Sequence, residues 1–291
     1  MSCSDCPGLL CPIRVNTHLA SYAPEACPCY LTESLTQMRF FKRFLGAKDL
    51  PPPRPAMPLA VIGDLHGRSD LLVELLERLA TQHGRDWVLV FVGDYVDRGD
   101  NSAEVLQFLR VHLGAIWPAK VICLKGNHEM MLLDFLDTPE SVGPSWLHHG
   151  GRHTLASFGV PQPDPGSEEA LRVAADALRA VMGPEVEAWL RGLPSSYLSG
   201  NLLVTHAGAN PHASPEDQTE ADLLWGHPDF LEVERRDGLW VAHGHTIQPF
   251  PSAKAGRIAV DTGAYATHCL TAALLRDGAC DFLSTRRPET V

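Results

Sequence analysis

The sequence lacks any long apolar run. Although 45% of its 291 residues are hydrophobic, no stretch approaches the roughly 20 apolar residues of a membrane-spanning helix. It also lacks an excess of positive charge, since 24 Lys and Arg stand against 35 Asp and Glu, a formal net charge of −11. A nucleic-acid-binding surface would need a basic face. We therefore expect a cytoplasmic protein without nucleic-acid or membrane partners, with one substantial core arranged as one large or two small domains.

The N-terminal segment is also expected to be a poor secretory signal, because no apolar stretch follows a basic N-terminal region. Five of the eight cysteines fall in the first 29 residues. Cys3-x-x-Cys6 with Cys27-x-Cys29 leaves a zinc knuckle or a disulfide loop open, but the irregular spacing favours a poorly structured extension. The Pro-rich stretch 51–55 predicts a stiff linker. We expect a poorly structured extension and linker over residues 1–55 and one domain over 56–288.

Short apolar segments alternate with helical periodicity from residue 59 onward. Strands are expected at 59–62, 87–92 and 121–124, with a helix at 69–83 and another that begins near Asn101, where Glu104 has the spacing of a capping box. This repetition predicts an α/β core with partly parallel strands. Strands at 202–205, 239–242, 258–261 and 269–275 follow in quick succession and predict a second sheet packed on the first.

Polar side chains follow these predicted strands, at the strand ends where ligands gather in α/β folds. Carboxylates, imidazoles and one amide form a donor set that suits Mn, Fe or Zn. Asp94 is the natural bridging residue because its carboxylate has two oxygens to share between two ions. The candidate metal ligands are Asp64, His66, Asp94, Asn127, His206 and His245.

The sequence motifs that contain these residues resemble those of the calcineurin-like metallophosphoesterases. The likeness is greatest to the phosphoprotein phosphatase branch, including its bacterial serine/threonine phosphatase and diadenosine tetraphosphatase relatives. It spans nearly all of 58–275 and implies a β-sandwich of two mixed sheets, flanked by helices, with a dinuclear metal site at the carboxyl edge of the strands. The phrases are Gly-Asp-Leu-His-Gly (63–67), Gly-Asp-Tyr-Val-Asp-Arg-Gly (93–99), Gly-Asn-His-Glu (126–129), Val-Thr-His-Ala-Gly (204–208) and His-Gly-His-Thr (243–246).

The resemblance also implies how two metal ions are shared. One ion would take Asp64, His66 and Asp94, and the other Asp94, Asn127, His206 and His245. His243 is a rival for the last place, but the family's terminal phrase reads Gly-His-Thr and so favours His245. We expect divalent or trivalent ions, Mn first and Fe or Zn as alternatives. A metal-bridging hydroxide would attack phosphorus directly, without a covalent enzyme intermediate.

Three residues near these phrases are candidates for catalysis. The planar guanidinium of Arg98 matches two phosphate oxygens. His128 follows the ligand Asn127 and can protonate the departing alkoxide, while Asp97 can hold its ring and raise its pKa. We therefore assign catalytic roles to His128, Asp97 and Arg98, with Arg98 and Asn127 also binding substrate.

The rest of the substrate pocket is less determined. His227 stands where many bacterial relatives have a second arginine, so His227, Arg235 or Arg236 could bind phosphate, or His227 could be a loop residue. Tyr265 is expected to border the pocket. Asp261 either orients a metal histidine or simply ends a strand. The helical insertion at 138–200 either forms a wall that sets substrate choice or only adds to the core.

Three functions follow. The first is a phosphomonoesterase of the serine/threonine protein phosphatase type, acting on a phosphorylated protein or a small phosphoester. The second is hydrolysis of a dinucleoside polyphosphate such as diadenosine tetraphosphate. The third is a non-catalytic phosphate-binding module, which would be expected to have lost a ligand or the His128–Asp97 pair, and neither is lost. The sequence predicts no oligomeric state.

The stretch from Met38 to Leu45 reads like the natural start of the bacterial relatives, so residues 1–37 are expected to be dispensable. A chain that begins at Met38 should keep the melting temperature and phosphoesterase activity of the full chain. Thermal unfolding and activity of the two chains, measured side by side, check this. A shortened chain that is inactive or unfolded would show that residues 1–37 are needed.

Overall fold

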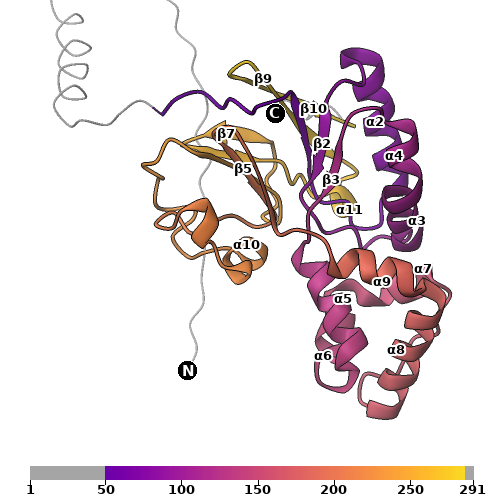
Figure 1. Ribbon diagram of the computed structural model, residues 1–291. Helices are drawn as coiled ribbons and strands as arrows, with labels where there is room; N and C mark the ends of the chain where they lie inside the picture. The colour runs from indigo at the N-terminus through magenta and orange to yellow at the C-terminus, as the bar shows by residue number, and fades with distance from the viewer. Residues whose placement is uncertain (1–49, 286–291) are drawn as a thin grey trace, which may run out of the picture. The chain divides into compact units, whose positions relative to one another are not determined.

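The computed structural model describes residues 50–285. The predicted cysteine-rich extension and Met38 therefore lie outside the described residues. The apolar segments that follow the linker form a five-stranded sheet in the order β10-β9-β1-β2-β3 (Figure 1), in which β1, β2 and β3 run parallel, β9 pairs antiparallel with β1, and β10 pairs antiparallel with β9. The strands are β1 Leu59–Ile62, β2 Val88–Phe91, β3 Val121–Cys123, β9 Thr271–Arg276 and β10 Ala279–Ser284.

The second sheet has the order β4-β5-β6-β8-β7, with β5, β6 and β8 parallel. Its strands are β4 Ser196–Ser199, β5 Leu202–Thr205, β6 Trp240–His243, β7 Ser252–Lys254 and β8 Arg257–Ala259. The prediction of two mixed sheets is confirmed. The strand expected at 269–275 was wrongly grouped with the second sheet, because β9 pairs with the free edge of β1, Leu275 opposite Leu59.

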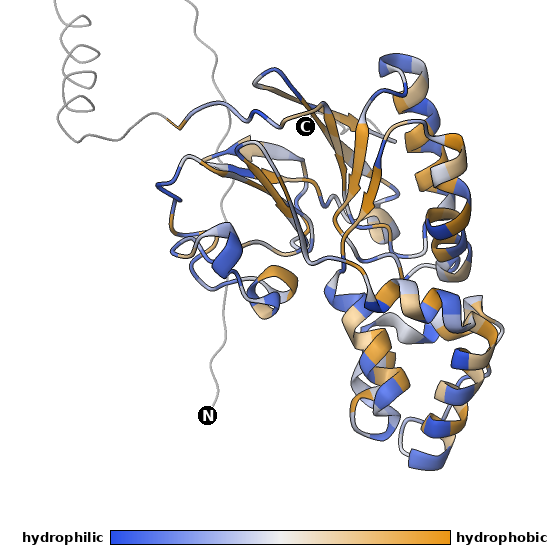
Figure 2. Ribbon diagram, in the orientation of Figure 1, coloured by the Kyte–Doolittle hydropathy of each residue, from blue (hydrophilic) through white to orange (hydrophobic). Residues whose placement is uncertain are grey.

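Side chains that alternate in direction along the strands give the first sheet an apolar layer on each face. Leu59 and Val61 belong to the cluster shared with the second sheet, whereas Ala60 and Ile62 belong to the cluster shared with the helices. This is the two-residue period of a strand buried on both faces. The central strands are accordingly the most hydrophobic part of the ribbon (Figure 2).

Helices cover the outer face of the first sheet (Figure 1): α2 Ser69–His83, α3 Ser102–Gln107, the π-helical turn η1 Phe108–His112 and α4 Leu113–Ile116. The helix predicted at 69–83 is confirmed. The predicted capping box is wrong, because Asn101 makes no side-chain cap and Glu104 instead accepts a 2.7 Å hydrogen bond from the Ser69 hydroxyl. Glu104 thus ties two neighbouring helices together.

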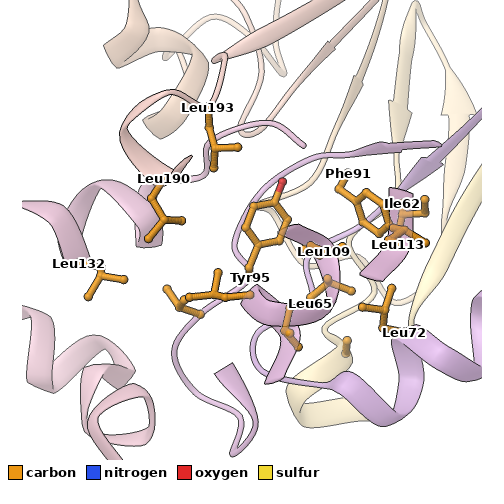
Figure 3. Packing of buried hydrophobic residues seen from close by; sticks show 14 of the residues in the cluster. Ile62, Leu65, Leu72, Phe91, Tyr95, Leu109, Leu113, Leu132, Leu190 and Leu193 are labelled. Atoms are coloured by element: carbon orange, nitrogen blue, oxygen red, sulfur yellow. The ribbon is translucent and has the colours of Figure 1, made fainter. Parts of the chain in front are cut away.

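The predicted insertion forms most of a group of helices that we call the helical lobe, residues 127–191. Its elements are α5 Asn127–Asp137, α6 Pro139–Trp146, η2 Leu147–Gly151, α7 Arg152–Ser157, α8 Glu168–Met182 and α9 Pro184–Arg191. Leu132 and Leu190 of the lobe belong to the same apolar cluster as Tyr95, which follows β2 (Figure 3). Val181 of α8, in contrast, is 56% exposed.

The remaining elements are the turn η3 Pro215–Asp217, α10 Glu220–Trp225 and α11 Ala264–Thr267. The described part of the Pro-rich segment lies against the second sheet, because the indole of Trp240 and the amide of Asn201 donate to the carbonyls of Pro51 and Pro52. The boundary at residue 56 stays a prediction. Among the helices of residues 50–285, none has the length and apolarity needed to cross a membrane.

Candidate metal centre and active site

Each predicted metal ligand lies just beyond the carboxyl end of a strand. Asp64 follows β1, Asp94 follows β2 and Asn127 opens α5 after β3, while His206 and His245 follow β5 and β6. Because β1 to β3 are mutually parallel, as are β5 and β6, each sheet presents its ligands at one edge. The packing of the two sheets brings the ligands together.

Asp94 lies at the centre of this cluster. Its Oδ2 is 3.4 Å from Nε2 of His66, and its Oδ1 is 3.4 Å from Nε2 of His206. The two oxygens of one buried carboxylate thus face two different groups of donors. This is the arrangement expected of a residue that bridges two ions.

The second group of donors is compact. Oδ1 of Asn127 lies 2.8 Å from Nε2 of His206 and 3.0 Å from Nδ1 of His245, and those two nitrogens are 3.2 Å apart. The lone pairs of an amide oxygen and two imidazole nitrogens therefore converge on one point. Together with Asp94 they offer four ligand atoms to a single ion.

Hydrogen bonds to backbone carbonyls fix the histidine rings. Nδ1 of His66 lies 2.8 Å from the carbonyl of Val96, and Nδ1 of His206 lies 3.1 Å from that of Val92, which leaves both Nε2 atoms for a metal. Burial lowers the pKa of His66 to about 3 and that of His206 to about 4. Both rings are consequently neutral at pH 7, the form in which imidazole binds metal.

Asp64 is the predicted ligand that lies outside the two groups of closely spaced ligand atoms. Both of its carboxylate oxygens accept from the backbone N–H of His245, at 3.1–3.2 Å, and the ligand atoms that gather around His66 and Asp94 include His128 instead. Burial raises the pKa of Asp64 well above its usual range, and Asp261 and Asp94 raise it further. Buried carboxylates so close together require positive charge, which divalent ions would supply. The donor set therefore fits metal ions.

His243 is placed differently from His245. Its Nδ1 lies 3.0 Å from the carbonyl of Gly244, and its ring packs edge-on against Phe230 with centroids 4.9 Å apart. Burial lowers the pKa of His243 to about 4. His245, not His243, shares the point of convergence with Asn127.

Strained backbone marks the same loops. Eight described residues other than glycine have positive φ, and five belong to the predicted site: His66, Asp94, Asp97, Arg98 and His245. Such conformations cost free energy and persist where surrounding contacts determine them. At Asp94, Glu129 supplies such contacts, because its buried carboxylate accepts from the backbone N–H groups of Asp94, Tyr95 and Gly126 at 2.7–2.9 Å.

His128 and Asp97 form the predicted pair, with Nδ1 of the ring 2.7 Å from Oδ2 of the carboxylate. The other ring nitrogen, Nε2, faces the metal cluster at 3.9 Å from Oδ2 of Asp94. Burial lowers the pKa of His128, but Asp94 and Asp97 outweigh it and the net shift is upward. Nδ1 of the ring is thus fixed by Asp97, and Nε2 is directed toward the predicted metal donors.

Arg98 and Tyr265 border the cluster. Nη1 of Arg98 is 2.9 Å from Nε2 of His66, and its guanidinium lies 5.0 Å from the centre of the Tyr265 ring. Tyr265, on α11, also meets the His66 ring edge-on at 5.3 Å. Both residues therefore stand beside the group formed by His66 and Asp94.

Three other predicted residues have hydrogen-bond partners outside the group of metal donors. Nδ1 of His227 accepts from the backbone N–H of Asp229, and its role in substrate binding stays a prediction. Arg235 donates to the carbonyls of Asn210 and Ala213 and pairs with Asp237, so it holds a loop in place. Asp261 accepts from the N–H of Gly263, as a residue that ends a strand does.

Three residues that contact the site were not predicted to do so from the sequence. Glu129 lies in the Gly-Asn-His-Glu motif, and its position three residues after Gly126 is the spacing of a helix cap that could have indicated its role. Trp146 and Thr154 both donate to the Asp97 carboxylate, at 3.0 and 2.6 Å. No local signal links residues some 50 positions apart in the sequence, so only the structure could reveal these two.

Comparisons with known proteins agree with this geometry. A family model described as calcineurin-like phosphoesterase matches residues 57–249. The chain is 43% identical to serine/threonine-protein phosphatase PP1-1 of Saccharomyces cerevisiae over 210 residues, 66% of this chain and 58% of that protein. It is 27% identical to the asymmetrical bis(5'-nucleosyl)-tetraphosphatase PrpE of Bacillus velezensis over 228 residues, 71% of this chain and 84% of that protein.

Solved structures share the fold at lower identity. A candidate diadenosine tetraphosphatase has a TM-score of 0.54 at 19% identity, over 80% of this chain and 95% of that one. A cold-active protein-tyrosine phosphatase of a Shewanella species has a TM-score of 0.53 at 18% identity, over 78% of this chain and 80% of that one. From the family model, the relatives and the convergent donor set, the chain belongs to the calcineurin-like phosphoesterase family and is a hydrolase of phosphoesters.

Proposed function

We propose that the chain is a phosphomonoesterase of the serine/threonine protein phosphatase type. The observation that supports this most is the Asp94 carboxylate, whose two oxygens face two sets of metal donors while the His128–Asp97 pair lies beside it. The similarity to the yeast phosphatase PP1-1 supports the same substrate class. Phosphoserine or phosphothreonine in a protein is therefore the proposed substrate.

The six predicted ligands would hold two metal ions, Mn in the first place and Fe or Zn as alternatives. Bound ions of this kind activate water at neutral pH and neutralise charge on phosphoryl oxygens. His66 and His206 would hold the ions through Nε2, because their other ring nitrogens are anchored to backbone carbonyls. The glycine at position 244 lets the loop pass close to Asp64, where a Cβ would lie 1.9 Å from the carboxylate.

Arg98 and His128 would act on the substrate itself. The guanidinium of Arg98, beside His66, can donate two parallel hydrogen bonds to phosphate oxygens. Nε2 of His128 can give its proton to the leaving oxygen while Asp97 holds Nδ1. Asn127 and Tyr265 are candidates for further contacts with the substrate, and His227 is another.

Hydrolysis of a dinucleoside polyphosphate is the second candidate. Its support is the similarity to PrpE, which extends over 84% of that protein. The metal donors and the His128–Asp97 pair would serve either reaction, since both break a phosphorus–oxygen bond. A non-catalytic phosphate-binding module is disfavoured because the donors and the acid–base pair are all present and close together.

Replacing His245 should remove metal, whereas replacing His243 should not. His245→Ala deletes one of the donors that converge with Asn127, so the chain should hold about one ion fewer after reconstitution. His243→Ala is the matched control because that ring packs on Phe230. Metal analysis of both purified variants checks this. Loss of metal in the His243 variant alone would reverse the assignment.

Replacing His128 should slow hydrolysis most for substrates with poor leaving groups. His128→Asn removes the proton donor, so turnover of an alkyl phosphate should fall roughly 100- to 10,000-fold. Hydrolysis of p-nitrophenyl phosphate should fall far less because its leaving group needs little protonation. Metal content should be unchanged, which separates an acid from a ligand. Equal losses on both substrates would contradict the acid role.

A direct comparison of substrates tests the proposed function. The full chain, reconstituted separately with Mn, Fe and Zn, is assayed on a phosphoserine peptide and on diadenosine tetraphosphate. We expect faster hydrolysis of the peptide, with the highest activity in Mn, and no activity after thorough chelation. Faster hydrolysis of the dinucleotide in every metal would favour the second candidate instead.

A further inference from the structure

We propose that Trp146 and Thr154 of the helical lobe are positioning residues, which fix the Asp97 carboxylate and through it the ring of His128. The proposal rests on the proposed phosphoester hydrolysis, because it concerns the proton that His128 gives to the leaving oxygen. Trp146 ends α6 and Thr154 lies in α7, so both come from the insertion and not from the sheets that carry the metal donors.

Asp97 is a fully buried carboxylate, 0% exposed, that depends on these donors. Its Oδ2 accepts from the indole Nε1 of Trp146 at 3.0 Å and faces Nδ1 of His128 at 2.7 Å. Its Oδ1 accepts from the hydroxyl of Thr154 at 2.6 Å. A buried carboxylate without such donors is costly, and hydrogen bonds to a charged group are the stronger kind. The two lobe residues therefore determine which way the carboxylate points.

Thr154 fixes the backbone of Asp97 as well as its side chain. The N–H of Asp97 donates to the hydroxyl oxygens of Thr154 at 2.9 Å and Ser102 at 3.1 Å. Asp97 has φ of 71°, a conformation that an aspartate holds only where its surroundings determine it. Serine could keep the hydroxyl contacts, whereas valine has nearly the same shape and no hydroxyl.

The direction of the Trp146 indole is set by packing. The ring is 1% exposed and stacks on Phe135, with centroids 4.4 Å apart and planes at 29°. Gly151 makes room on its other side, since a Cβ there would lie 2.4 Å from indole carbons. A donor locked by its neighbours holds a catalytic group more rigidly than a mobile one. The lobe thus supplies a rigid support for the acid.

This support acts on only one part of the reaction. In the hydrolysis, water gives up one proton to solvent, and its oxygen bonds to phosphorus as the bond to the leaving oxygen breaks. The electron pair of the broken bond stays with the leaving oxygen, which takes the proton from Nε2 of His128, and the ring later regains a proton from solvent. A misplaced ring impairs proton donation and leaves the metal donors as they are.

The test compares Trp146→Phe, Thr154→Val and Thr154→Ser in the full, Mn-reconstituted chain. Turnover is measured on a phosphoserine peptide and on p-nitrophenyl phosphate, together with metal content. Trp117→Phe is the matched control, because it deletes an indole hydrogen bond of similar length, 2.8 Å to the Trp87 carbonyl, from another buried tryptophan.

We expect Trp146→Phe and Thr154→Val to lose about 10- to 100-fold on the phosphopeptide, with much smaller losses on p-nitrophenyl phosphate and unchanged metal content. Thr154→Ser and Trp117→Phe should keep the wild-type ratio of the two activities. Equal losses on both substrates in the soluble variants, or a Trp117→Phe ratio that shifts like that of Trp146→Phe, would overturn the positioning role. A wild-type chain inactive on both substrates would instead refute the proposed function, and the positioning role with it.

Discussion

The contact on which the site depends is the Asp94 carboxylate between His66 and His206, each 3.4 Å away. Asp94 can occupy this place only because its backbone adopts φ of 55°, and Glu129 stabilises that conformation by accepting its N–H at 2.8 Å. The same Glu129 carboxylate accepts from Gly126 at 2.9 Å and so joins the loops that follow β2 and β3. A single buried acid therefore keeps Asp94, the proposed bridging ligand, and Asn127 in register.

The convergence of the metal donors was predictable because each donor directly follows an apolar strand. Parallel strands place their carboxyl ends at one edge, so Asp64, Asp94 and Asn127 had to be near each other once three parallel strands were expected. His206 and His245 follow the same rule in the second sheet. Local periodicity was sufficient for the long helix at 69–83, whose leucines recur on one face.

Contacts between distant segments could not be predicted in this way. The strand β9 comes after the second sheet in the sequence, yet it pairs with β1, because nothing in a local pattern shows which sheet edge is free. Glu104 has the spacing of a cap and uses its carboxylate on Ser69 instead. His227 stands at a position where many bacterial relatives have arginine, but the path of its loop is set by contacts such as that with Asp229.

The two parts of the site depend on different parts of the fold. The metal donors project from the ends of the strands, and their positions follow from the pairing of the sheets. The proposed acid, His128, depends on the helical lobe, because the fully buried Asp97 carboxylate takes hydrogen bonds from Trp146 and Thr154 as well as from His128. A lobe that only added to the core would have no need of polar atoms directed at a buried charge, since burying them unpaired costs free energy. The placement of those atoms against Asp97 therefore argues that the lobe supports the catalytic machinery as well as enlarging the core.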